Sequence, residues 1–367
     1  MNEIFYQTKT KFTNTGDALI NKALISNLRA YGKIYANCSR EIPSEFIDQL
    51  GIKKEEKIAS SSELLFVKSV LMHALKNRDN VYVFSGPGDL YGNGMKLIVR
   101  NYLATIPFLF FRICGVKIVR IGRSVGPISR GLAMSEKIRC KFLTYYYVRD
   151  TKSFERCKRI GIKNVSICPD MSWLYERDKI RKINHSNIVM VNLRNSIFDD
   201  IDPNFINYTL KMCKNILFEL KNHIENMKVI ICYQISEDRD FSKEVFDYLK
   251  EDFDTEYYEN QLYLKDIEKY YGNCIVHISN RMHSLLAGYK YGSLPIAIID
   301  SKIHTKISAT LTDCDLDRII IDIHEGDCSG KIQYIYMNRE KLLKDFFEAE
   351  KKNNSEIDNV LNDIFKV

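Results

Sequence analysis

The feature that most limits the fold of this chain is a set of short, nearly continuous apolar runs, each followed by a helical pattern. Residues 81–85, 187–193 and 294–299 are runs of this kind. Strands that lack polar alternation are buried on both faces, as in parallel sheets covered by helices. Strands that alternate with helices along the chain indicate βαβ units. The sequence therefore predicts an α/β protein.

The strand–helix pattern is interrupted once and then restarts. The charged stretch 176–182 has no apolar face and is interpreted as a linker. A chain of 367 residues is long enough for two domains of ordinary size. We expect two doubly wound, Rossmann-like domains that face a cleft. The expected division is an N-terminal domain over 1–175, a C-terminal domain over 176–338, and C-terminal helices with a tail over 339–367.

The charge and cysteine content of the chain indicate which ligands and which cell compartment suit it. The net charge is +7 and is spread along the chain without a long Lys/Arg tract, which argues against nucleic-acid binding. A mildly basic protein suits an anionic substrate or an anionic membrane surface, and solvated charged faces explain the same balance. Ten cysteines occur and none forms a CxxC pair, a pattern typical of reduced thiols in the cytoplasm. The first residues carry no signal-peptide pattern. We expect a cytoplasmic protein.

The most apolar segment covers residues 102–111 and ends at Arg112. It is too short to span a bilayer, which takes about 20 apolar residues. A core helix is the first interpretation, as part of a helical pattern that covers 95–111. A helix that touches a membrane surface is the alternative, so peripheral contact with the inner face of the membrane stays open. The oligomeric state is not determined by the sequence.

Ligands of open α/β sheets bind beyond the carboxyl ends of the strands, so the loops there are examined for chemistry. The strongest candidate is Ser-Asn-Arg-Met-His-Ser at 279–284, after the apolar strand 274–278. Ser279 and Asn280 are expected to cap the next helix and to place Arg281 and His283 in its first turn. A helix N-terminus with cationic side chains beside it favours an anion. A structural histidine is the competing interpretation.

Other strand-end loops supply weaker candidates. Arg194 follows the strand 187–193, and arginine forms bidentate contacts with carboxylate and phosphate. Lys302 follows the strand 294–299 and adds positive charge. Arg123 lies in a Gly-Pro loop after the strand 117–121.

Two glycine-containing turns complete the set. Asn14-Thr15-Gly16-Asp17 precedes a helix, where simple capping explains the same residues. Gly86-Pro87-Gly88 follows the strand 81–85 and has neither the Lys-Ser/Thr pair of a Walker loop nor a dinucleotide fingerprint. HExxH, EF-hand and Gly-x-Ser-x-Gly patterns are absent, and no metal is expected.

Taken in order, these loops resemble the polysaccharide pyruvyl transferase family. The matching elements run from about Asn14 to Lys302. They are Asn14-Thr15-Gly16-Asp17, Gly86-Pro87-Gly88, Gly122 to Pro127, Arg149-Asp150-Thr151-Lys152-Ser153, Pro169-Asp170, Ser279-Asn280-Arg281-Met282-His283, Gly292-Ser293-Leu294-Pro295 and Asp300-Ser301-Lys302. The chain departs from the family pattern at Pro87 and Asp89, and Arg123 stands where Gln is common. These departures concern the acceptor side rather than the donor side.

The resemblance implies two Rossmann-like domains, similar to GT-B glycosyltransferases. It implies phosphoenolpyruvate as donor, with no further cofactor, and a saccharide acceptor for which a lipid-linked form stays open. The product is a pyruvate ketal on a cell-surface polysaccharide such as an exopolysaccharide or capsule. We expect His283 to act as general acid and Asp17 to orient or deprotonate an acceptor hydroxyl. The expected substrate-binding residues are Arg194, Arg281, Ser284, Asn14, Gly16, Gly86, Gly88, Arg123 and Lys302.

Two other functions fit the same pattern. A GT-B-like glycosyltransferase that uses a nucleotide sugar has the same fold, and Arg281 and His283 would then meet a diphosphate. A glycan-binding relative without catalysis is the second alternative.

Overall fold

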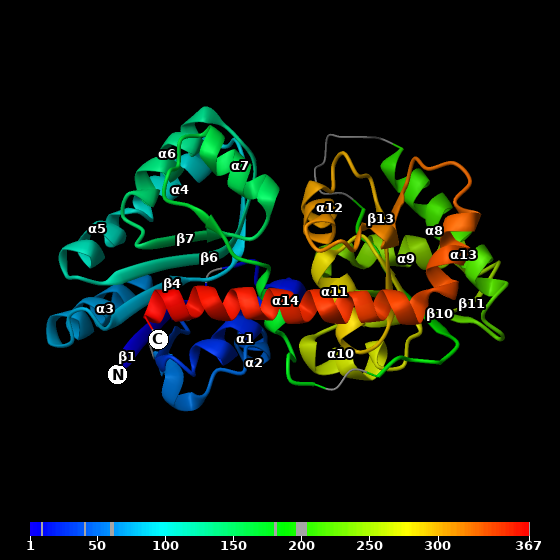
Figure 1. Ribbon diagram of the computed structural model, residues 1–367, viewed down its shortest axis with the longest axis horizontal. Helices are drawn as coiled ribbons and strands as arrows, with labels where there is room; N and C mark the ends of the chain where they lie inside the picture. The colour runs from blue at the N-terminus through cyan, green and yellow to red at the C-terminus, as the bar shows by residue number, and fades with distance from the viewer. Residues whose placement is uncertain (9, 40–41, 59–61, 180–181, 196–203, 367) are drawn as a thin grey trace. The chain divides into compact units, whose positions relative to one another are not determined.

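The computed structural model describes residues 1–366 except 9, 40–41, 59–61, 180–181 and 196–203. The described chain forms two compact units, and each is treated by itself (Figure 1). Unit 1 comprises Met1–Phe12, Asp17–Tyr175 and Asn353–Val367, and unit 2 comprises Thr13–Gly16 and Glu176–Lys352. The expected linker 176–182 lies at the start of unit 2, with residues 180–181 outside the described residues.

Unit 1 is built on a parallel sheet whose described strands have the order β3-β2-β1-β4-β6-β7-β8. The first part of β6 pairs with β4, and its second part pairs with β5. The strands are β1 (Asn2–Gln7), β2 (Gly32–Asn37), β3 (Lys57–Ile58), β4 (Val81–Ser85), β5 (Gly88–Gly92), β6 (Lys117–Ile128), β7 (Tyr145–Val148) and β8 (Ser166–Ile167).

Helices alternate with these strands along the chain, as the sequence pattern predicts. They are α1 (Thr15–Leu28), α2 (Ser44–Gln49), α3 (Glu63–Lys76), α4 (Met95–Leu103), α5 (Ile106–Ile113), α6 (Arg130–Cys140) and α7 (Thr151–Arg159). The single helix expected over 95–111 is wrong, because the chain forms α4 and α5 with a break at Ala104 and Thr105. Pro107 lacks an amide hydrogen and is tolerated only in the first turn of a helix, so a new helix begins just before it.

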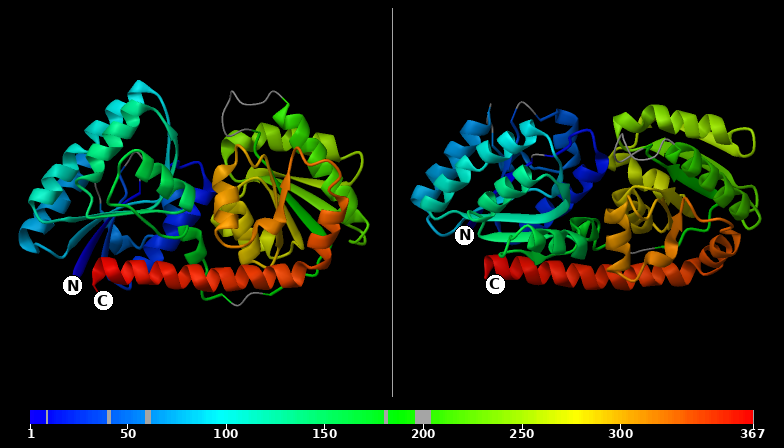
Figure 2. Two further views of the ribbon diagram at one scale, coloured as in Figure 1. Left: turned by 45° about the horizontal axis from the view of Figure 1, so that its top comes forward. Right: turned by 90° about the horizontal axis from the view of Figure 1, so that it is seen from above.

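Unit 2 holds a second parallel sheet, with the order β11-β10-β9-β12-β13-β14 and helices on both faces (Figure 2). Its strands are β9 (Ile188–Asn192), β10 (Lys228–Tyr233), β11 (Asp254–Gln261), β12 (Val276–Ser279), β13 (Leu294–Ile299) and β14 (Ile320–Asp322). Its helices are α8 (Phe205–Lys221), α9 (Arg239–Leu249), α10 (Leu264–Tyr271), α11 (Met282–Lys290), α12 (Thr305–Thr312) and α13 (Ser329–Met337).

The centre of the second sheet is fully enclosed. Every residue of β12 and β13 is buried, which agrees with the continuous apolar run of β13. In β12 the buried residues include the polar His277 and Ser279. The chain passes outward from β9 to β10 and β11, then returns to the other side of β9 with β12. The crevice at such a reversal is the usual ligand site of a doubly wound sheet. In unit 2 the loops after β9 and β12 meet at this point.

The C-terminal residues form one helix, α14 (Arg339–Phe365), where the sequence suggests one or two helices and a tail. Its first part belongs to unit 2 and its last part to unit 1. In unit 1 the ring of Phe365 stacks on Tyr31 with a centroid distance of 4.7 Å. In unit 2 the Glu350 carboxylate accepts a hydrogen bond from the Tyr289 hydroxyl at 2.6 Å and pairs with the buried ammonium of Lys290.

The Lys290–Glu350 pair provides a test of how α14 is held in unit 2. Glu350→Leu leaves the Lys290 charge buried without its carboxylate, so we expect the free energy of unfolding to fall by about 3–5 kcal/mol. Lys290→Met/Glu350→Leu removes both charges and should recover most of that loss. Urea denaturation of both variants measures the difference, with Glu348→Gln on the exposed Lys351–Glu348 pair as the matched control. A single variant as stable as wild type would contradict the assigned role.

Candidate functional site

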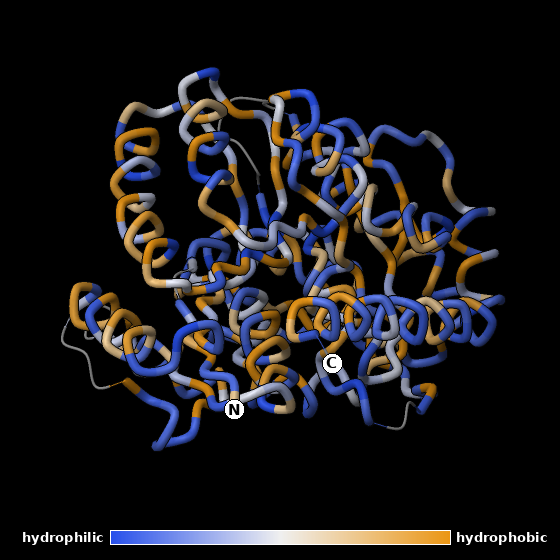
Figure 3. Tube along the Cα trace, turned by 60° about the vertical axis from the view of Figure 1, so that its left-hand side comes forward, coloured by the Kyte–Doolittle hydropathy of each residue, from blue (hydrophilic) through white to orange (hydrophobic). Residues whose placement is uncertain are grey.

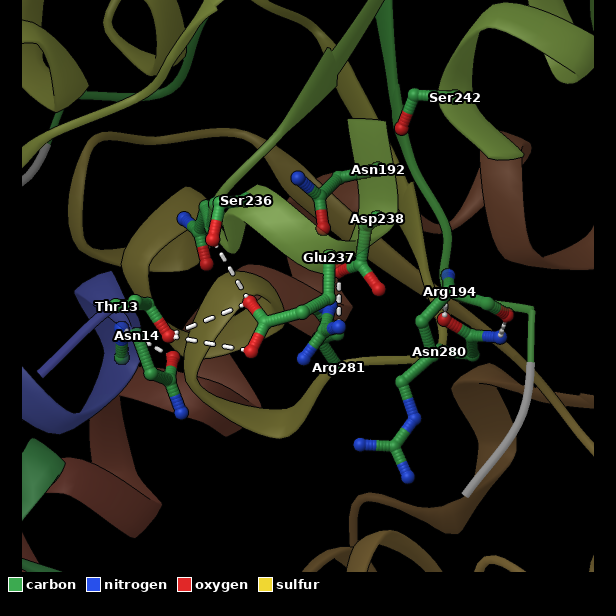
Figure 4. A network of polar contacts seen from close by, with 12 residues as sticks. Thr13, Asn14, Asn192, Arg194, Ser236, Glu237, Asp238, Ser242, Asn280 and Arg281 are labelled. Carbon is green, nitrogen blue, oxygen red and sulfur yellow. Dashed lines mark hydrogen bonds and ion pairs between the residues drawn. The ribbon is translucent and has the colours of Figure 1, made fainter. Parts of the chain in front are cut away.

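In unit 2 the loops that follow β9 and β12 are joined by hydrogen bonds (Figure 4). The Asn280 side chain accepts from the Arg194 backbone amide at 2.9 Å and donates to the Arg194 carbonyl at 2.9 Å. The Ser279 hydroxyl donates to the Asn192 carbonyl at 2.6 Å and accepts from the Arg281 amide at 3.0 Å. The two side chains thus tie the ends of two neighbouring strands together.

This arrangement corrects the expected capping of α11. Arg281 itself occupies the N-cap position, and its carbonyl accepts the first helical hydrogen bond, from Leu285 at 3.0 Å. Ser279 and Asn280 were expected to cap the helix, but their side chains bind backbone groups around β9 instead. His283 lies in the first turn, as expected, and is 9% exposed.

The guanidinium group of Arg281 forms an ion pair with Asp238, whose carboxylate is almost fully buried. Asp238 follows β10 and ends the short 3-10 helix Ser236–Asp238. A buried arginine needs such a partner, because an isolated charge is costly away from water. Asp238 is not among the residues expected from the sequence, because acidic residues are common at the start of any helix. In Figure 4 the Arg194 and Arg281 side chains lie toward the same edge of the network.

The segment Thr13–Gly16 belongs to unit 2, although the sequence placed it in the N-terminal domain. The Thr15 amide donates to the Gln234 carbonyl at 3.2 Å. The Gln261 side chain donates to the Thr13 carbonyl at 2.9 Å and to the Gln234 carbonyl at 3.0 Å. These contacts fasten the segment across the loop that follows β10.

Gly16 lies directly against His283. A Cβ atom placed on Gly16 would be 2.8 Å from His283 Nδ1 and 2.9 Å from His283 Cβ. The Asn14 side chain accepts from the Gly16 amide at 2.9 Å, which fixes the turn at this contact. Asn14 and Gly16 are therefore brought to the candidate histidine by the fold, and only glycine leaves room for the imidazole in its present position.

Ser284 points into the core rather than toward this loop. It is fully buried, and its hydroxyl lies 2.9 Å from the Tyr271 hydroxyl and 3.2 Å from His277 Nε2. Burial lowers the pKa of His277 to about 3, so its imidazole is neutral at physiological pH. The Ser284 hydroxyl therefore has hydrogen-bond partners in the core, and it lies away from the candidate site.

A further polar cluster follows β13. Asp300 Oδ1 accepts from the Lys302 amide at 2.8 Å, and Asp300 Oδ2 lies 3.2 Å from His324 Nε2. His304 is buried, and its Nδ1 lies 3.2 Å from both the amide nitrogen and the carbonyl oxygen of Asp300. Burial lowers the pKa of His304 to about 4, and the positive charge of Arg194 acts in the same direction. The sequence analysis missed both histidines, and it named Lys302, whose side chain is exposed.

The remaining candidates lie in unit 1. Asp17 accepts hydrogen bonds from the Thr10 hydroxyl and from the Lys11 amide, which holds the turn before α1. Gly88 on β5 pairs with Arg123 on β6, and a Cβ at Gly88 would be 3.4 Å from the Arg123 guanidinium. Burial lowers the pKa of Arg123 to about 10. Gly86 packs against Asn21 after β4, at the corresponding reversal of the first sheet.

The Arg149-Asp150 element and Asp170 have structural partners in unit 1. Arg149 donates to Asp170 at 2.9 Å, and Asp150 accepts from the Ser153 amide at 2.7 Å at the start of α7. In the described parts of the chain, no group of three or more His, Cys, Asp or Glu side chains is arranged to hold a metal ion.

The contact between Gly16 and His283 can be tested directly. Gly16→Ala inserts a methyl group into the space of the imidazole, so we expect the His283 ring signals in a ¹H–¹³C NMR spectrum to shift. His283→Gln assigns the signal among the seven histidines. Gly330→Ala in α13 is the control, because its methyl would meet nothing within 4 Å. Unchanged His283 signals in Gly16→Ala would show that the two residues are not in contact in solution.

Comparisons with known proteins agree with this architecture. The HepE protein of Anabaena, solved with UDP, matches over 100% of both chains with a TM-score of 0.59 and 9% identity. A glycosyltransferase of Rickettsia africae matches over 100% of this chain and 99% of its own, with a TM-score of 0.57 and 11% identity. UDP-GlcNAc 2-epimerase of Neisseria meningitidis, solved with UDP-GlcNAc, matches over 96% and 94%, with a TM-score of 0.54 and 11% identity.

These likenesses confirm the fold class predicted from the sequence, two Rossmann-like sheets of the GT-B kind. A search of curated proteins returned no match. The profile of the family described as polysaccharide pyruvyl transferase matches residues 14–293, which is most of the chain. The matched region contains Asn14 and Gly16 of the segment Thr13–Gly16 as well as Arg194, Arg281 and His283. The chain therefore belongs to the polysaccharide pyruvyl transferase family.

Proposed function

We propose that this protein transfers the enolpyruvyl group of phosphoenolpyruvate to a saccharide and forms a pyruvate ketal during the synthesis of a cell-surface polysaccharide. The observation that carries the proposal is the position of His283. It lies in the first turn of α11, next to Arg281 and against Gly16, at the reversal of the second sheet. A titratable group at a helix N-terminus with cationic neighbours suits proton transfer to a bound anion.

The donor carries a phosphate and a carboxylate, so it needs more than one cationic contact. Asp238 offsets the charge of Arg281 and holds its guanidinium group in place. Arg194 and the amide groups at the start of α11 then supply the remaining attraction for an anion. We assign Arg194 and Arg281 to the donor and add His304 to this group. Its neutral imidazole lies near Arg194 and, among the described residues, no hydrogen-bond partner is present for Nε2.

The proposed chemistry balances without a redox partner or further cofactor. His283 gives a proton to the methylene carbon of the donor, and an acceptor hydroxyl oxygen bonds to C2 and loses its proton. The C2–O bond to phosphate breaks, and phosphate leaves with the bonding electron pair. A second hydroxyl oxygen bonds to C2 and loses its proton, which closes the ketal. The two acceptor hydroxyls together lose two protons. One is balanced by the new hydrogen of the methyl group and the other by a proton on the released phosphate. General acid catalysis of this kind contributes about 10²–10⁴-fold.

We assign the acceptor to unit 1. Arg123 is largely buried beside Gly88, and the missing side chain of Gly88 leaves space next to the guanidinium group. A largely buried cation within β6 favours hydrogen bonds to saccharide oxygens or to an anionic group of the acceptor. Asp17 holds the turn before α1 through Thr10 and Lys11, which supports a role in shaping this side rather than in taking a proton.

The proposal is tested by incubating the protein with phosphoenolpyruvate and a panel of saccharides, followed by mass spectrometry. We expect one class of acceptor to gain the mass of a ketal-linked pyruvate while phosphate is released. His283→Gln should lower the rate by about 10²–10⁴-fold. The control is His185→Gln, which replaces an exposed histidine of the same unit. Product formed from a nucleotide sugar instead, or a His283→Gln rate within a few-fold of wild type, would overturn the proposal.

A further inference from the structure

Helices α4 and α5 of unit 1 leave a continuous series of large apolar side chains on the surface. We call these residues the apolar face; it consists of Met95, Val99, Tyr102, Leu103, Ile106, Leu109, Phe110 and Ile113. Met95 is 72% exposed, Ile113 is 66% exposed and Phe110 is 50% exposed. Single exposed apolar residues are common on soluble proteins, but a contiguous group of this size marks an interaction surface.

The exposure does not come from poor packing of these helices. Phe108 and Phe111 of α5 are buried in the core of unit 1, so the helix is anchored by one side and exposes the other. Ile98 of α4 packs tightly against Gly131 of α6. The apolar face is thus held rigidly by the fold, and the residues that cover it must come from outside unit 1.

The neighbouring helix α3, which packs against α5, extends the exposed apolar surface. Leu64 and Leu75 are each 79% exposed, and Met72 is 49% exposed. Figure 3 colours the chain by hydropathy and shows hydrophobic turns recurring along the outer helices of unit 1. An interfacial helix inserts this kind of side chain into the boundary between lipid headgroups and acyl chains.

The charged side chains of α4 and α5 are all basic. No Asp or Glu occurs between Leu90 and Ser135 in the sequence. Lys96, Arg100 and Arg112 lie on α4 and α5 and are exposed. Basic side chains beside an apolar helix face match an anionic lipid surface, because the negative surface potential of the lipid attracts them.

The same charges disfavour a second copy of the chain as the occupant. A two-fold dimer through this face would bring Lys96, Arg100 and Arg112 of both copies into one interface, and α4 and α5 offer no acidic residue to pair with them. A bilayer that contains anionic lipid satisfies both the apolar and the basic residues. Helices α4 and α5 are short, and no helix among the described residues is long and apolar enough to cross a membrane.

We propose that the apolar face of α4 and α5 docks the protein on the surface of an anionic membrane, with Phe110 and Ile113 entering the interface and Lys96 and Arg100 contacting lipid phosphates. This inference goes beyond the proposed function and holds whichever donor the enzyme uses. It concerns residues of unit 1 that are outside the candidate catalytic residues.

The test uses the full chain and sedimentation with vesicles of phosphatidylcholine, with and without phosphatidylglycerol. We expect wild type to bind the anionic vesicles, to bind the neutral ones at least roughly ten-fold more weakly, and to be released by salt. Phe110→Gln/Ile113→Gln should weaken binding to anionic vesicles by at least roughly ten-fold. Lys96→Gln/Arg100→Gln should remove most of the difference between the two lipids.

The matched control is Phe218→Gln/Met337→Gln, which removes two exposed apolar side chains of unit 2 and should leave vesicle binding unchanged. Thermal denaturation confirms that each variant is folded. No binding by wild type, equal binding to both lipids, or an equal loss in the control would overturn the proposal. A wild-type dimer in analytical ultracentrifugation that Phe110→Gln/Ile113→Gln dissociates would also overturn it, since the face would then belong to a second copy.

Discussion

The site in unit 2 depends on the pair of hydrogen bonds between the Asn280 side chain and the Arg194 backbone. β9 and β12 are neighbours in the sheet but lie far apart in sequence, and the crevice between their ends would otherwise be lined by two independent loops. Asn280 joins the loops at the residue that precedes the N-cap of α11. This contact fixes the backbone of Arg194 directly. It also fixes the start of α11 and the placement of His283, because both lie within three residues of Asn280.

Charge in this crevice is balanced rather than simply positive. Asp238 pairs with Arg281, so part of the attraction that the sequence suggests for an anion is already used within the protein. The advantage is orientation, since a paired guanidinium group loses less freedom when a ligand binds. In the proposed function, Arg194, the amide groups of α11 and the neutral His304 add to the attraction for the anionic donor.

The sequence predicted what depends on local pattern. The bounds of β4 and β13 agree with the expected ones, because continuous apolar runs define both strands. Partners across the fold could not be predicted. Asp238 meets Arg281 only because β10 and β12 flank β9, and Thr13–Gly16 reaches His283 only through tertiary contacts. Ser284 follows His283 directly, yet successive helical residues point about 100° apart. His283 therefore faces the segment Thr13–Gly16, and Ser284 faces the core.

The central claim is that the crevice of unit 2 binds phosphoenolpyruvate, and thermal denaturation with added ligand tests it most directly. A ligand that binds only the folded protein raises the melting temperature, by an amount that grows with its concentration relative to Kd. The account predicts that phosphoenolpyruvate raises the melting temperature of wild type, that Arg194→Gln removes the effect, and that UDP-sugars have little effect. Stabilisation by a UDP-sugar without stabilisation by phosphoenolpyruvate would contradict it.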